Sequence, residues 1–233
     1  DNGMPFPRVK GQVYPFDNHL PLAIRWGNGI KNPGRVVNNY FSFSDFAPTF
    51  LDLAGIGEKY HDMNPFSGKS WNPVFKDLPD IHPRDYIIIG KERHDVGRKD
   101  DRGYPVRGII EGNYFFSHNY KPDRWPAGNP ETGYLNTDGS PTKTEILNLR
   151  REGKDSTYWN YAFGKRPQDE LYNIEKDPQC LKNLAFDESY SSLKKSLKDK
   201  LIGDLNQQGD PRVLGDGDVF DQYPYSGENV KNF

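Results

Sequence analysis

The sequence predicts an α/β fold, and three features of the chain support that prediction. Residues 84–90 contain three consecutive isoleucines in an apolar run typical of a β-strand. Residues 106–110 and 114–118 form two further predicted strands, joined by a short turn that contains glycine. After Asp187, apolar residues recur at spacings of three and four, which indicates an amphipathic helix. Closely spaced strands followed by a helix favour an antiparallel sheet with one C-terminal helix.

The other elements follow from local signals. Residues 20–26 are predicted to form a short buried strand. Ser44 is the expected N-cap of a helix that ends at Gly55. A long loop is expected over residues 119–141, whose aromatic side chains either stack on sugar rings or pin the loop to the protein. A further strand is expected at residues 170–174.

Composition limits the classes of function. The 233 residues carry a formal net charge of −2, so the protein as a whole has no field that attracts polyanions. The lysines of the C-terminal helix lie largely off its apolar stripe, so we expect no nucleic-acid binding. The apolar runs are too short to span a bilayer. Cys180 is the only cysteine, which excludes an intramolecular disulfide, and we expect it to be structural.

The first ten residues combine hard oxygen ligands with a cation. Asp1 and Asn2 offer oxygens that suit Ca²⁺, with Mg²⁺ as the second choice, and Gly3 permits a sharp turn. Lys10 returns a positive charge towards the same point. A metal and a lysine at one place would hold a sulfate or a phosphate. The same Asp-Asn-Gly sequence is also common in ordinary turns.

Several motifs, in order along nearly the whole chain, resemble the formylglycine-dependent sulfatases. Asp1-Asn2-Gly3 followed by Lys10-Gly11 is similar to the second metal-binding segment of that family. Residues 43–55 resemble its Asp-x-x-Pro-Thr-x-Leu-x-Leu-x-Gly helix, and residues 170–178 resemble its C-terminal strand and turn. The sequences of residues 2–7 and 104–107 are most similar to those of the heparan N-sulfatase (sulfamidase) branch.

The resemblance implies the C-terminal part of an alkaline-phosphatase-like sulfatase fold. Residues 1–83 would then complete a main α/β domain whose mostly parallel sheet is flanked by helices. Residues 84–233 would form a smaller antiparallel-sheet subdomain with the C-terminal helix and a tail.

The family's nucleophile is a formylglycine made in a Cys/Ser-x-Pro-x-Arg motif, which Cys180 does not match. We therefore expect this chain to be the C-terminal part of a longer enzyme, preceded by a hydrophobic strand. A free ammonium group at Asp1 would lie beside a divalent cation, at an electrostatic cost.

The resemblance implies hydrolysis of a sulfate ester or N-sulfate in a sulfated oligo- or polysaccharide. Asp1 and Asn2 would bind Ca²⁺, and Lys10 would stabilise charge on the sulfate oxygens during the reaction. Lys10 is a departure, because the sulfamidase branch can carry Arg there. The missing N-terminal part of the enzyme would be a partner, and the location would be periplasmic, secreted or lysosomal.

Substrate recognition is expected in the charged loop that follows the strand at residues 84–90. Arg93, His94, Asp95 and Arg98 are the predicted binding residues, since rigid strands commonly deliver such loops to a pocket. A solvent-exposed loop of mixed charge is the alternative. Arg107 is expected either to reach the same pocket or to pair with a carboxylate.

Two other functions fit the sequence. One is a phosphate or phosphonate ester hydrolase of the same superfamily, with a similar metal and nucleophile. The other is a non-catalytic polysaccharide-binding protein, which the absence of a nucleophile from this chain leaves open.

Overall fold

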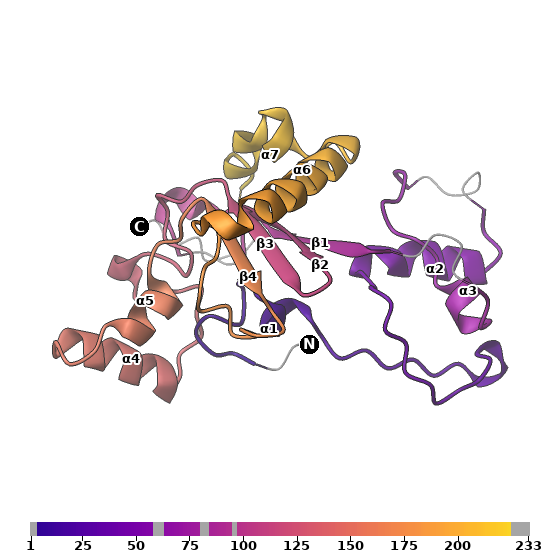
Figure 1. Cartoon of the computed structure of the whole chain (residues 1–233), viewed down its shortest axis with the longest axis horizontal. Helices are drawn as coiled ribbons and strands as arrows, with labels where there is room; N and C mark the ends of the chain where they lie inside the picture. The colour runs from indigo at the N-terminus through magenta and orange to yellow at the C-terminus, as the bar shows by residue number, and fades with distance from the viewer. Residues whose placement is uncertain (1–3, 58–62, 80–83, 95–96, 225–233) are drawn as a thin grey trace. The chain divides into compact units, whose positions relative to one another are not determined.

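The computed structural model describes residues 4–57, 63–79, 84–94 and 97–224 (Figure 1). The chain divides into two compact units. Unit 1 comprises residues 1–21 and 88–233, and unit 2 comprises residues 22–87. The first 21 residues therefore group with the sheet that follows residue 84, not with the segment next to them in sequence. No helix in the described part of the chain has the length and apolar character needed to cross a membrane.

A four-stranded sheet lies at the centre of unit 1 (Figure 1). Its strands, in spatial order, are β1 (Tyr86–Lys91), β2 (Val106–Glu111), β3 (Tyr114–Asn119) and β4 (Asp169–Asn173). The β2–β3 and β3–β4 pairs are antiparallel. The sequence prediction of an antiparallel sheet is confirmed, with each strand within about two residues of its expected bounds.

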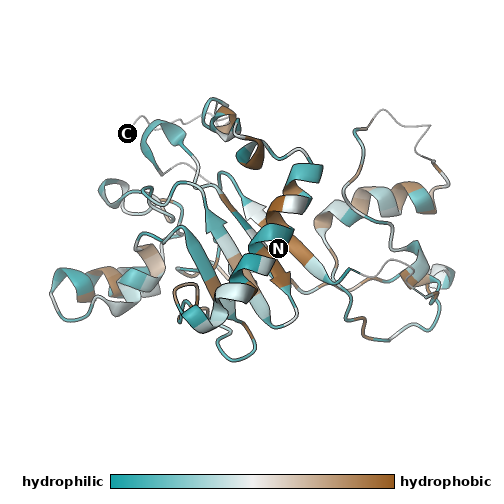
Figure 2. Cartoon of the chain, turned by 45° about the horizontal axis from the view of Figure 1, so that its top comes forward, coloured by the Kyte–Doolittle hydropathy of each residue, from teal (hydrophilic) through white to brown (hydrophobic). Residues whose placement is uncertain are grey.

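One face of the sheet is covered by α6 (Ser191–Gln207). The predicted stripe is confirmed, because Leu197, Leu201 and Leu205 are buried against β2 and β3. Asp187 caps the short 3-10 helix that leads into α6 by accepting a hydrogen bond from the Ser189 amide. Figure 2 shows hydrophobic and hydrophilic residues mixed along α6, as expected for a helix with one buried face.

The other face carries a buried polar network that ties the N-terminal segment to the sheet. The Glu170 carboxylate, 2% exposed, accepts hydrogen bonds from the hydroxyls of Tyr14 (3.0 Å) and Tyr172 (2.7 Å) and from the Asn119 amide (3.0 Å). Tyr14 immediately precedes α1 (Pro15–Asn18), and burial raises the pKa of its hydroxyl to about 12. The residues just before Tyr14 are therefore held close to the strands.

The longest helices of unit 1 that were not predicted are α4 (Pro141–Arg151) and α5 (Thr157–Phe163). They pack together beside Tyr134, with Trp159 and Phe163 in a small aromatic core. This favours the interpretation that the aromatic residues of the 119–141 loop pin it to the protein.

The remaining elements of unit 1 are short. They are α7 (Pro211–Leu214) and the 3-10 helices Lys99–Asp101, Pro130–Thr132, Glu188–Tyr190 and Gly217–Asp221. Cys180 is buried and burial raises the pKa of its thiol to about 12, in keeping with a structural residue.

Unit 2 contains α2 (Phe46–Leu53), α3 (Asn72–Phe75) and the 3-10 helices Phe43–Asp45 and Gly27–Gly29. The predicted helix before Gly55 is present, but Ser44 is not its N-cap: α2 begins at Phe46, and Ser42 is the N-cap of the 3-10 helix Phe43–Asp45 that leads into it. Ser42 and Asp45 form a capping box, in which the Asp45 carboxylate accepts from the Ser42 amide at 2.8 Å.

The prediction of a strand at residues 20–26 is wrong. This segment has no regular strand, and its apolar residues Leu22, Ile24 and Trp26 are more than two-fifths exposed. An apolar run forms a strand only where a neighbouring strand offers backbone partners, and none of the described strands pairs with this segment. Among the described residues before Arg84 no strand is present, so the mostly parallel sheet remains a prediction.

Candidate functional site

An open cleft of about 530 Å³ lies in unit 1, where the N-terminal segment meets the end of β1. Its walls come from two stretches that are distant in sequence and both rich in charged and polar residues. The lining residues are Lys10, Gly11, Gln12, Asp17, Asn18, Leu20, Gly90, Lys91, Glu92, Arg93 and His94. The cleft therefore brings together Lys10, Arg93 and His94, three of the residues singled out from the sequence.

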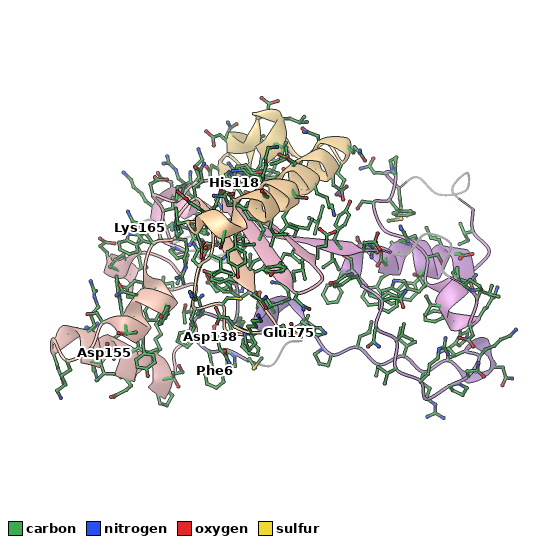
Figure 3. The ribbon with its side chains drawn as sticks, viewed as in Figure 1. Phe6, His118, Asp138, Asp155, Lys165 and Glu175 are labelled. Carbon is green, nitrogen blue, oxygen red and sulfur yellow. The ribbon has the colours of Figure 1, made fainter. Side chains whose placement is uncertain are left out.

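Lys10 presents its ammonium group at the surface of the cleft. Its Nζ donates to Asp138 Oδ2 at 3.0 Å, and both side chains are more than two-fifths exposed. Asp138 is labelled in Figure 3. An exposed ion pair of this kind contributes little free energy, so Lys10 can exchange Asp138 for another anion at small cost.

Gly11 sets the distance between Lys10 and His94. It has a φ of +73°, and a Cβ at this position would lie 2.6 Å from Nδ1 of the His94 ring. A side chain would thus be strained and would displace the imidazole. Lys91 fixes the same turn from the other side, because its Nζ donates to the Gly11 carbonyl oxygen.

Lys91 is the residue with the most perturbed charge in the cleft. Burial of its amine, together with the positive charges of Arg98 and Arg166, lowers its pKa to about 7, although Asp17 opposes the shift. The Lys91 ammonium also lies 5.6 Å from the centre of the Tyr104 ring. A strongly perturbed amine in a cleft is typical of a functional site.

The predicted binding loop is only partly in the cleft. Arg93 lines it, although its guanidinium also donates to the carbonyl oxygens of Asp101 and Tyr223. Arg98 is 3% exposed, does not line the cleft, and donates to the carbonyl oxygens of Arg102 and Trp125. Asp95 lies outside the described residues.

The sequence left open whether Arg107 reaches the pocket or pairs with a carboxylate, and the structure answers this. Its guanidinium binds Glu92 Oε1 at 2.7 Å and Asp210 Oδ2 at 2.5 Å, so it pairs with carboxylates. Glu92 lines the cleft whereas Arg107 does not, so Arg107 supports a cleft residue and does not line the cleft itself.

The metal-binding prediction falls on residues that the structure does not describe, since Asp1 and Asn2 precede residue 4. Within the described ranges no group of three or more His, Cys, Asp or Glu side chains could hold a metal ion. The Ca²⁺ site, with Mg²⁺ as the second choice, remains a prediction.

Comparison with family models gives no match. Among solved structures, a putative sulfatase from Bacteroides thetaiotaomicron aligns with 72% of this chain and 25% of its own, at 20% identity and a TM-score of 0.42.

Sequence comparison gives matches over nearly the whole chain. An ulvan-active sulfatase from Formosa agariphila is 27% identical over 235 residues, which cover 99% of this chain and 36% of that protein. The N-sulphoglucosamine sulphohydrolase of Homo sapiens is 26% identical over 229 residues, which cover 95% of this chain and 43% of that protein. The chain is similar in sequence to these two sulfatases over 95% or more of its length. The predicted resemblance is confirmed, and the chain spans about two-fifths of the length of these relatives.

Lys91, Asp17 and Gln12 are among the cleft-lining residues that sequence reasoning missed. Lys91 is the last residue of β1, and a charged residue at the end of an apolar strand is the signal that could have found it. Asp17 and Gln12 reach the cleft only because Tyr14 is anchored to Glu170 in the sheet. No local sequence pattern encodes that long-range contact.

Proposed function

We propose that this chain is the C-terminal part of a sulfatase that removes a sulfate ester or N-sulfate group from a sulfated saccharide. The observation that carries the proposal is the cleft that Lys10 and His94 both line, with the His94 ring packed against Gly11. Sequence similarity to two sulfatases over 95% or more of the chain supports it.

The charges around the cleft suit an anionic group. Lys10 and Arg93 are cationic side chains of the cleft, Lys91 is cationic below its lowered pKa of about 7, and Asp17 and Glu92 are acidic. Glu92 is already paired with Arg107, so it presents less negative charge to the cleft. A sulfate oxygen could replace Asp138 as the partner of Lys10, and its developing charge would strengthen that contact in the transition state.

His94 is the residue we propose for sugar recognition. Its imidazole is exposed beside Lys10 and can donate a hydrogen bond to a hydroxyl or a sulfate oxygen in either protonation state. Arg93 is a second binding residue in the same wall. Asp95 remains part of the proposal as an acceptor for sugar hydroxyls, whereas we assign Arg98 to support of the loop.

Ca²⁺, or less favourably Mg²⁺, would be held by the oxygens of Asp1 and Asn2 with carboxylates from the rest of the enzyme. When bound, the ion would neutralise sulfate oxygens. The formylglycine nucleophile would also belong to the part of the enzyme that precedes this chain. Periplasmic, secreted or lysosomal location fits this class of substrate.

Unit 2 supports the presence of that preceding part as a partner. Phe46 and Phe50 stack on α2, and Phe43, in the preceding 3-10 helix, contacts the Phe46 ring; Phe43 and Phe50 are 63–69% exposed. Exposed apolar side chains in such number indicate a surface that another protein segment covers. We propose that the N-terminal part of the enzyme covers it and that its main α/β domain, with a mostly parallel sheet, includes residues 1–83.

The test is turnover by the product of the complete gene. N-sulfated and O-sulfated glucosamine should release sulfate, and Lys10→Ala should lower kcat by about 10²- to 10³-fold. Lys195→Ala, in an exposed pair with Asp199 on α6, is the matched control and should leave turnover unchanged. Preferential hydrolysis of a phosphate or phosphonate ester would favour the superfamily alternative. Saccharide binding without turnover, insensitive to chelator, would favour the non-catalytic alternative.

A further inference from the structure

The wall of the cleft formed by β1 is held from behind by the C-terminal segment 210–224. Glu92 receives two guanidinium groups: Arg107 Nη2 binds its Oε1 at 2.7 Å, and Arg212 Nη2 binds its Oε2 at 2.9 Å. The Arg212 side chain is 3% exposed and that of Arg107 is 10% exposed. Two nearly buried cations therefore compensate the carboxylate of Glu92, a residue that lines the cleft.

The C-terminal segment completes this group with its own carboxylate. Asp210 accepts from Arg107 at 2.5 Å and 3.2 Å, and it also accepts from the Arg212 amide at 2.8 Å, where it caps α7. Asp218 accepts from Arg212 and from Lys121. Each charge in this network has an opposite charge beside it, which buried ion pairs require to be stable.

Side-chain-to-backbone hydrogen bonds link β2 and the same segment to the neighbouring residues of the wall. Arg107 Nη1 donates to the Lys91 carbonyl oxygen at 3.2 Å, and Arg93 donates to the carbonyl oxygen of Tyr223 at 3.2 Å. Asp221 pairs with Arg124 at 2.7 Å. Three consecutive cleft residues, 91–93, are thus held by groups that do not line the cleft themselves.

We infer that Arg212 is a positioning residue for the anion-binding cleft. It holds Glu92 against the sheet, sets the position of β1's end, and keeps the Glu92 charge away from a bound sulfate. The consequence for sulfate rests on the proposed function, whereas the consequence for the position of β1 does not.

The variant Arg212→Gln separates this role from a general loss of fold. It leaves Glu92 with Arg107 alone, so the carboxylate is less compensated and can turn towards the cleft. Amide hydrogen exchange in residues 88–94 should become at least about tenfold faster, because a broken buried ion pair loosens the elements that it joins. Exchange in β3 and β4 should stay unchanged. Lys195→Gln, in an exposed pair on α6, is the control.

The second readout is affinity for inorganic sulfate, measured by titration of the 233-residue chain. Affinity should fall about tenfold in Arg212→Gln, through repulsion by Glu92. It should return to within about twofold of the original in the double variant Glu92→Gln/Arg212→Gln, since the repelling charge is then absent. Rescue by removing a charge is not expected if Arg212 only stabilises the fold.

Unchanged exchange in residues 88–94, or a double variant no better than the single one in a chain that binds sulfate, would overturn the inference. If Arg212→Gln does not fold, Arg212→Lys replaces it, because lysine keeps the charge but cannot form the paired hydrogen bonds. Faster local exchange in that variant supports the inference, and unchanged exchange overturns it. If the original chain binds no sulfate while exchange responds as expected, the proposed role of this cleft in sulfate binding fails and the positioning role of Arg212 stands.

Discussion

The two units differ in how completely they bury their apolar side chains. Unit 1 has fully buried aromatic and aliphatic residues on both sides of its sheet, among them Phe115, Phe116, Ile109 and Leu201. In the described part of unit 2, Trp71 and Phe75 are the buried large hydrophobics, while Val36 is 85% exposed.

This difference indicates that unit 2 depends more than unit 1 on contacts outside its own residues. Unit 1 can account for its own stability through core packing around the sheet. Unit 2 relies on local devices, such as the capping box of Ser42 and Asp45 and the pair between Asp45 and Arg84. Contacts of that kind are small in number, and we expect unit 2 to be the less stable part of the isolated chain.

The sharpest test of the comparison is a pair of phenylalanine truncations. Phe116→Ala in the core of unit 1 should cost about 3–5 kcal/mol of unfolding free energy, because it leaves a cavity. Phe50→Ala on the exposed face of α2 should change stability by no more than about 0.5 kcal/mol in this chain. Urea denaturation followed by segment-resolved hydrogen exchange measures both. Similar losses in the two variants would break the comparison.

A second test removes the carboxylate on which unit 2 depends. Asp45 is fully buried, and Arg84 binds it at 2.7 Å and 2.8 Å. Burial alone would raise its pKa, but hydrogen bonds from Arg84 and from the amides of Ser42 and Lys69 bring the pKa below the ordinary 3.8. Asp45→Asn should destabilise unit 2 by about 3 kcal/mol, because Arg84 loses its partner.

The lowered pKa of Asp45 also fixes the sign of a pH effect. Its stabilisation is present in full above pH 3.8 and is lost as the pH falls through the folded-state pKa. Exchange in residues 42–53 should accelerate on acidification in the original chain and respond less in Asp45→Asn. Asp77→Asn, at an exposed pair with Arg35, is the control. An equal effect of the two variants would count against the assignment.

Elements with a strong local pattern could be predicted from the sequence. The strands β1 to β4 and α6 were found because apolar spacing alone determines them. The segment at residues 20–26 failed because an apolar run does not reveal whether a strand partner exists. The helix α4 was missed although Ser140 followed by Pro141 is a typical helix start, since its few apolar residues are masked by charge.

The residues of the candidate site likewise fall into those that the sequence identified and those that it did not. Lys10 and His94 were identified from motif spacing, and the structure places both in one cleft. Lys91 was missed although its place at the end of an apolar strand marks it in the sequence. Arg212 could not be found, because its role depends on a contact with a residue far away in the chain. Arg98 is charged and close to His94 in sequence, yet the backbone turns it inward to bind carbonyl oxygens.

A third prediction concerns the pH dependence of unit 1. Lys91 has a pKa of about 7 in the folded chain against an ordinary 10.5. Between these values the unfolded chain binds more protons, so stability should rise with pH, with a slope of at most about 1.4 kcal/mol per pH unit. Lys91→Met should flatten this slope and give its largest relative stabilisation below pH 7. The exposed Lys10→Met is the control. Thermal unfolding between pH 6 and 10 is the measurement, and an unaltered slope in Lys91→Met would contradict the assignment.

The smallest expected effect is the difference in stability loss between alanine variants of two serines, Ser42 and Ser44, at the 3-10 helix that leads into α2. Ser42 accepts a hydrogen bond from the Ser44 amide, and its own amide donates to Asp45. Ser42→Ala should therefore cost about 1 kcal/mol, in the range for the loss of an N-cap. Ser44→Ala should cost less, because the Ser44 hydroxyl bonds only to that of Ser42 among the contacts described. Local exchange at residues 46–50 would distinguish them. A larger effect at Ser44 would show that the helix begins where the sequence alone placed it, and that unit 2 is held by a different local contact from the one in the structure.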